Sequence, residues 1–159
     1  KLITDEAIAV LVTELFPRAA VITPNLDEAS LLVGQPIVSV PDMYHAAQTL
    51  LGQGARAVLL KGGHLAGAVV VDLLLVPAAE PLWMKAPRID SANTHGTGCT
   101  LSSAVAAHLA LGLSLPEAVQ QARAYVRGAL QAGASVKTGQ GSGPLNHGFA
   151  PLPMRLMTG

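Results

Sequence analysis

The sequence is poor in the residues that mark many nucleic-acid-binding and membrane-associated proteins. Aromatic residues make up 3% of its 159 residues and charged residues 13%, and ten basic side chains balance ten acidic ones. A neutral chain gives no electrostatic basis for binding nucleic acid or an anionic membrane. So few aromatic side chains also argue against a surface on which bases stack. We therefore expect no nucleic acid and no membrane among its partners.

Cysteine is almost absent too. Cys99 is the only one, which excludes an internal disulfide and a multi-cysteine metal site. The five histidines, at positions 45, 64, 95, 108 and 147, do not have the spacing of a zinc motif. The longest apolar run, Ala66 to Ala79, contains Asp72 and is too short to cross a bilayer, and we find no signal-peptide pattern. A cytoplasmic location is the expectation that follows.

Half of the residues are apolar, which is typical of an α/β chain with a well-buried sheet. The length suits one domain or a large part of one. Periodicity, caps and Gly or Pro stops predict helices over about 5–16, 26–33, 41–51, 99–111 and 115–132. Apolar runs predict strands over 19–23, 56–61, 68–76 and 81–86. The last two strands are expected to form an antiparallel hairpin.

A glycine turn, Asn93-Thr94-His95-Gly96-Thr97-Gly98-Cys99, opens a helix of small residues. The free N–H groups and the dipole at a helix N-terminus favour an anion, and the same dipole favours the thiolate of Cys99. The alternative is plain turn chemistry followed by a small, buried cysteine. The turn lacks the Gly-Lys-Ser/Thr of a Walker P-loop and is not a complete dinucleotide fingerprint.

Asn25 and Glu28 stand where a short apolar strand gives way to a helix. Asn25 is a good N-cap, Glu28 falls at the third helical position and Gly34 is a stop signal, which predicts a capping box with a structural role. A ligand role is compatible with that cap, because open α/β sheets bind ligands at helix starts just beyond strand ends.

Lys61 ends a buried strand and is followed by Gly62, Gly63 and His64. A lysine in this place can simply reach solvent. A long cation beside a glycine pair at the carboxyl end of a strand is also placed to hold a phosphate.

Four motifs in this order resemble the hydroxymethylpyrimidine/phosphomethylpyrimidine kinases of the ribokinase-like superfamily: 23–29 (TPNLDEA), 58–64 (VLLKGGH), 93–100 (NTHGTGCT) and 143–147 (GPLNH). The likeness runs to about His147. It implies an α/β fold, ribokinase-like, with three α/β/α layers and a mostly parallel central sheet. Residues 1–147 would be the C-terminal part of a single kinase domain whose N-terminal part, with much of the pyrimidine pocket, is missing from this chain. Residues 148–159 would be a C-terminal tail, for which disorder is one interpretation.

The resemblance also implies a reaction. A kinase of this family uses ATP and Mg²⁺ to phosphorylate 4-amino-5-hydroxymethyl-2-methylpyrimidine and then its monophosphate, in thiamine biosynthesis, and often forms a homodimer. By the same resemblance, Gly96, Thr97 and Gly98 form an anion hole for the transferring phosphate. Lys61 and Gly62, with Thr97 and Gly98, would bind the nucleotide phosphates. Asn25 and Glu28 would hold magnesium through water.

Cys99 takes the place where most ribokinase-like enzymes carry a catalytic aspartate. In the first phosphorylation its thiolate can accept the proton of the alcohol. In the second, the acceptor is already an anion and needs little help from a base. We therefore hypothesise that a neutral thiol is useful because it avoids the repulsion that a fixed carboxylate would impose.

Other functions stay open from the sequence. The nearest is a pyridoxal kinase or another ribokinase-like small-molecule kinase, because those relatives can share the glycine–cysteine turn. A different class is a thiol enzyme in which Cys99 is the nucleophile and His95 or His64 the base, although no third, orienting residue is evident. The last is an inactive fragment with a binding or structural role.

Overall fold

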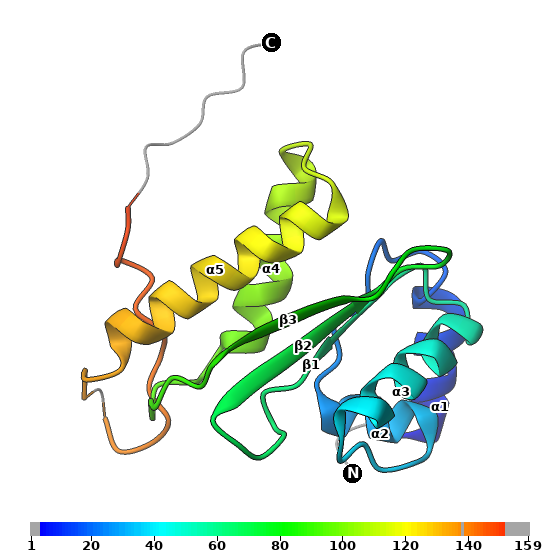
Figure 1. Cartoon of the computed structure of the whole chain (residues 1–159), viewed down its shortest axis with the longest axis horizontal. Coiled ribbons are helices and arrows are strands. Elements are labelled where there is room, and N and C mark those ends of the chain that lie inside the picture. The colour runs from blue at the N-terminus through cyan, green and yellow to red at the C-terminus, as the bar shows by residue number, and fades with distance from the viewer. Residues whose placement is uncertain (1–3, 138, 152–159) are drawn as a thin grey trace. The chain divides into compact units, whose positions relative to one another are not determined.

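The computed structural model describes residues 4–137 and 139–151. The chain divides into two compact units, Lys1–Arg88 and Ile89–Gly159 (Figure 1). No helix among the described residues is long and apolar enough to cross a lipid bilayer. Of the predicted tail, residues 152–159 lie outside the described residues.

The helices of the first unit begin at side-chain caps. Helix α1 (Asp5–Val10) starts at Thr4 and continues into a π-helical turn, η1 (Leu11–Leu15), that the sequence does not predict. Helix α2 (Leu26–Val33) starts at Asn25 and ends at Gly34, whose φ of 74° is the left-handed conformation that favours glycine. Helix α3 (Val40–Gly52) starts at Ser39, whose hydroxyl accepts from the Asp42 N–H. The cap predicted at Asn25 and the stop predicted at Gly34 are confirmed.

The sheet of the first unit has the order β1 (Val58–Lys61), β2 (Val69–Leu75), β3 (Leu82–Pro87). All three strands pair antiparallel, with Lys61 opposite Asp72, so the predicted hairpin is confirmed. The expectation of a mostly parallel sheet is not met by these strands. Among the described residues of this unit, parallel pairing is limited to two isolated bridges.

The predicted strand over 19–23 is not a regular strand, because its pairing with β1 is reduced to those two bridges. Ile22 pairs with Val58 and Asn25 with Lys61. Between them, the carbonyl of Pro24 accepts from the Lys61 N–H at 3.0 Å. Proline has no N–H, so the ladder lacks the hydrogen bond that would join the two bridges into a strand.

One face of helix α3 closes the core of the first unit. Its inward side chains, Met43, Ala46, Ala47 and Leu50, are fully buried. They belong to the same apolar cluster as strand residues Val58, Leu60, Leu73 and Leu75. This burial holds the carboxyl end of β1 in a fixed place beneath the helices.

The second unit is built on two helices, α4 (Thr97–Ala110) and α5 (Leu115–Gly133). Leu101 and Val105 of α4 are buried, as is an alanine-rich face of α5, and small residues let two helices pack closely. Gly112, with φ of 87°, makes the turn between them. At the start of α5, hydrogen bonds from the hydroxyl and the N–H of Ser114 hold the pKa of the Glu117 carboxyl below its usual value.

Gly62 should be the least replaceable glycine after β1. A Cβ at this position would lie 1.8 Å from the carbonyl oxygen of Val71, whereas a Cβ at Gly63 would meet nothing within 4 Å. We expect Gly62→Ala to lower the free energy of unfolding by about 1–3 kcal/mol, because the backbone must move. Gly63→Ala, the matched control, should change it by less than about 0.5 kcal/mol. Urea unfolding of both variants checks this, and equal midpoints would contradict it.

Candidate functional site

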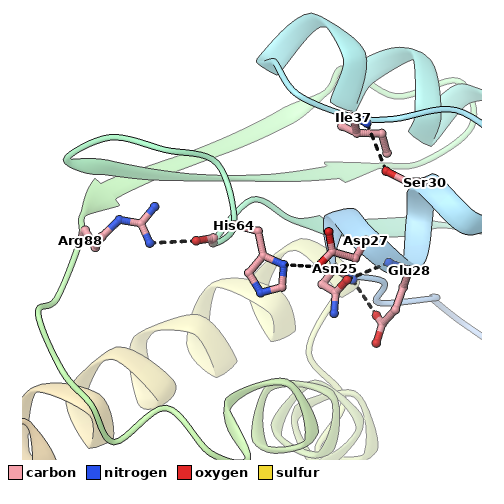
Figure 2. A network of polar contacts seen from close by, with 8 residues as sticks. Asn25, Asp27, Glu28, Ser30, Ile37, His64 and Arg88 are labelled. Carbon is pink, nitrogen blue, oxygen red and sulfur yellow. Dashed lines mark hydrogen bonds and ion pairs between the residues drawn. The ribbon is translucent and has the colours of Figure 1, made fainter. Parts of the chain in front are cut away.

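The predicted capping box at the start of α2 is confirmed. The Asn25 Oδ1 accepts from the Glu28 N–H at 2.8 Å, and the Glu28 Oε2 accepts from the Asn25 N–H at 2.7 Å (Figure 2). The parallel bridge places Asn25 opposite Lys61, at the carboxyl end of β1. The first unit thus brings together all four of its predicted site residues: Asn25, Glu28, Lys61 and Gly62.

The donor set beside Lys61 suits a hard cation only in part. Asn25 and Glu28 offer an amide oxygen and a carboxylate, which are ligands that Mg²⁺ accepts. Each can accept further bonds beyond the capping box, because an ionised carboxylate has about four lone-pair sites. The described residues contain no cluster of three His, Cys, Asp or Glu that could hold a metal by itself. A cation here would therefore need ligands from water or from a bound phosphate.

Gly62 has a structural reason to be glycine. Its N–H donates to the Asp72 Oδ1 at 3.0 Å, and its α-carbon lies against the backbone of Val71. Asp72 is only 9% exposed, and the sequence analysis gave it no role. The sequence does contain a signal for the role of Asp72, which is a single acidic residue inside an otherwise apolar strand. A carboxylate buried in this way needs hydrogen-bond donors.

The glycine turn forms the second predicted set, in the second unit. Gly96 is left-handed, with φ of 83°, and is the N-cap residue of α4. Thr97 is held in the turn by its hydroxyl, which donates to the Thr94 carbonyl at 2.7 Å. Within the described residues, no acceptor is recorded for the N–H groups of Gly98 and Cys99, and Cys99 is exposed. Two free donors at a helix N-terminus are the arrangement that binds an anion.

Asn93 holds this turn in place, a role that the sequence analysis did not assign. Its buried side-chain amide donates to the carbonyls of Gly133 and Val136, both at 2.6 Å. Its Oδ1 lies so close to Gly143 that a Cβ there would approach it to 1.9 Å. The neighbouring His95 N–H donates to the Gly143 carbonyl at 3.1 Å. The turn is thus fixed to the end of α5 and to the loop that follows.

An open groove of about 520 Å³ begins at Cys99 and runs along α4. His108 lies on its wall, with Tyr125 of α5 and His147 opposite. The Tyr125 hydroxyl and the His147 Nδ1 are 3.2 Å apart. Within the described residues, no hydrogen bond joins the Cys99 thiol to a histidine, so the geometry offers no support for a Cys–His nucleophile.

Comparison with known sequences gives consistent matches. A family model described as phosphomethylpyrimidine kinase matches residues 1–146. The hydroxymethylpyrimidine/phosphomethylpyrimidine kinase of Streptomyces coelicolor is 48% identical over 149 residues, which are 94% of this chain and 54% of that protein. The thiamine biosynthesis bifunctional protein ThiED of Geobacter sulfurreducens is 45% identical over 154 residues, which are 97% of this chain and 31% of that protein. The chain spans about half the length of the single-function relatives.

Comparison with solved structures confirms the expected ribokinase-like fold. The pyridoxal kinase of Staphylococcus aureus in complex with AMP-PCP matches with a TM-score of 0.86 and 33% identity. The match covers 92% of this chain and 54% of that one. Here too, the chain corresponds to about half of its relative.

The Asn93 contacts predict a large effect of one amide on stability. Asn93→Ala should lower the free energy of unfolding by about 2–3 kcal/mol, because two carbonyl oxygens lose their donor. Asn146→Ala is the matched control: its amide donates to the Ala132 carbonyl at 3.5 Å on the exposed surface, and its loss should cost less than about 1 kcal/mol. Urea unfolding compares the two, and a similar cost for both would rule out the anchoring role of Asn93.

Proposed function

Because the chain belongs to the phosphomethylpyrimidine kinase family, we propose that it carries the phosphate-binding part of a kinase for hydroxymethylpyrimidine and its monophosphate. The donor is ATP, and the pathway is thiamine biosynthesis. The observation that carries the proposal is the glycine turn: a left-handed Gly96 leaves the N–H groups of Gly98 and Cys99 without an acceptor in the described part of the chain.

The turn has the chemistry of an anion hole. Phosphoryl transfer depends mainly on positioning and on stabilising charge at the phosphate oxygens. Gly96, Thr97 and Gly98 are proposed to shape the hole, while the Thr97 N–H donates to the Thr94 carbonyl at 3.2 Å. The N–H groups of Gly98 and Cys99 would meet the charge, and because they are already in place they need no rearrangement as it grows. The first turn of α4 contains no acidic residue that would oppose an anion.

The first unit carries a positive charge that suits a phosphate. Lys61 ends β1 and its ammonium group is proposed to neutralise nucleotide phosphates, while Gly62 lets the chain turn tightly beside them. Lys61 is held at this end of the sheet by its bridge to Asn25. A residue whose backbone is already fixed loses less backbone entropy on binding than one in a segment that must first be ordered.

Asn25 and Glu28 are proposed to hold Mg²⁺, largely through water. When bound, magnesium would neutralise charge on the phosphates. Two protein oxygens suit an ion that usually keeps several waters and is bound with the help of substrate phosphates.

Cys99 is proposed as the group nearest the acceptor, at the third residue of α4. In the first reaction its thiolate is proposed to take the proton of the hydroxymethyl group. In the second reaction the acceptor is a phosphate, which is already negatively charged. A neutral Cys99 thiol would not repel this phosphate, whereas a carboxylate would.

Pyridoxal is the second candidate acceptor. The structural similarity to a pyridoxal kinase, with a TM-score of 0.86, favours it, whereas the sequence relatives favour the pyrimidine. A single kinase domain over residues 1–147, a homodimer and a cytoplasmic location stay predictions of the family resemblance.

The test is release of ADP by the purified chain with Mg²⁺, ATP and one acceptor at a time. We expect turnover with hydroxymethylpyrimidine and with its phosphate, at kcat/KM values at least about tenfold above that for pyridoxal, the scale set by an acceptor whose hydrogen bonds the site matches. EDTA should abolish it. Faster turnover with pyridoxal would reverse the acceptor assignment, and no ADP from any acceptor would contradict a kinase activity of this chain.

Cys99→Asp tests the proposed reason for the thiol. The carboxylate should lower kcat/KM for the monophosphate at least about tenfold more than for the alcohol, because repulsion at about 4 Å costs on the order of 1 kcal/mol or more. Cys99→Ser, which is neutral and similar in size, is the control and should not separate the two reactions in this way. Equal losses with Asp for both acceptors would contradict the hypothesis.

A further inference from the structure

Arg88 makes an unusual set of contacts for an exposed side chain. It follows β3, and its guanidinium donates to the carbonyls of Gly63, Leu65 and Gly67, with Nη1 2.8 Å from the first and Nε 2.9 Å from the last. Figure 2 shows Arg88 and one of these three bonds. The backbone N–H of Arg88 donates to the Ala68 carbonyl at 2.8 Å. One residue thus holds every second carbonyl of the loop between β1 and β2.

This loop begins at the proposed phosphate site. Lys61 is the last residue of β1, and Gly62 is the first residue of the loop. A turn inside the loop brings the Leu65 N–H to 3.1 Å from the Gly62 carbonyl. We call the three guanidinium bonds of Arg88 the Arg88 clamp. The clamp acts on the backbone within a few residues of Lys61.

The clamped loop also contacts α2. His64 lies between two of the carbonyls that Arg88 binds, and its Nδ1 is 3.0 Å from the Asp27 Oδ2 (Figure 2). Asp27 belongs to the first turn of α2, beside the capping box of Asn25 and Glu28. The loop thus joins the two elements that carry the proposed phosphate and magnesium ligands.

We propose that Arg88 is a positioning residue for nucleotide phosphate: its guanidinium fork fixes the 62–67 loop and so holds Lys61 and the first turn of α2 ready for the phosphate groups. The inference rests on the proposed function. Arg88 acts through the loop, since within the described residues its guanidinium donates to three loop carbonyls. Preorganisation of this kind raises affinity because the loop does not have to be ordered on binding.

Arg88 could also favour phosphate binding through its positive charge alone, without fixing the loop. One substitution separates the charge effect from the positioning effect. Among the described residues Arg88 forms no ion pair. Its positive charge could therefore attract phosphate without any clamp. Arg88→Lys keeps the charge but cannot reproduce a planar fork that reaches three carbonyls. Arg88→Gln removes both charge and fork.

The experiment measures binding of Mg²⁺–ADP and of adenosine to the 159-residue chain and its variants, together with hydrogen exchange. We expect both Arg88→Lys and Arg88→Gln to weaken ADP binding by about tenfold, the effect of losing charge-assisted hydrogen bonds. Adenosine, which has no phosphate, should bind all variants equally. The Gly62 and Leu65 amides should exchange faster in both variants. Lys85→Gln, an exposed cation of β3, is the matched control and should change none of these values.

The outcomes are distinct. Loss of ADP affinity in both variants, with adenosine binding unchanged and faster exchange at Gly62 and Leu65, supports the clamp. Normal ADP binding in Arg88→Lys overturns it in favour of charge alone. Equal loss of ADP and adenosine binding overturns it in favour of general destabilisation. If the unsubstituted chain binds no ADP, the proposed function fails and the positioning role fails with it.

Discussion

One backbone contact sets the arrangement of the first unit: the hydrogen bond from the Lys61 N–H to the Pro24 carbonyl. It aligns the end of β1 with the start of α2, so that a cation, an amide and a carboxylate stand side by side. The buried face of α3 holds β1 in place from below. Proline at this position also ends the pairing, which frees the chain to turn into α2. The proposed phosphate-binding residue, Lys61, thus lies at the carboxyl end of β1, where the pairing with residues 22–25 ends.

The two candidate sets use the same physical feature in different ways. Both lie at the N-terminus of a helix, where backbone donors lack partners. In α2 those donors are satisfied by Asn25 and Glu28, which leaves outward oxygens suited to a cation. In α4 the N-cap is Gly96, which has no side chain to satisfy them, so the donors stay available for an anion. The capping residue therefore distinguishes the two helix ends, which we propose bind charges of opposite sign.

Local patterns in the sequence predict most helices, the hairpin and the capping box at Asn25, because caps, stops and alternation act within a few residues. They do not predict the π-helical turn after Val10 or the loss of regular strand pairing at Pro24. The resemblance to a kinase family comes from short motifs and is confirmed. Arg88 and Asn93 could not be found in this way, because their partners are carbonyl groups 21–43 residues away, and a carbonyl carries no signature in sequence.

The anchoring of Asn93 also has a consequence for the order of folding. Its amide joins the glycine turn to carbonyls 40 and 43 residues further along the chain. Both helices of the second unit lie between those points, and closing so long a loop carries an entropic cost. We therefore expect the turn to reach its final geometry after α4 and α5 have formed and packed. An early folding intermediate would then contain both helices but not the fixed glycine turn.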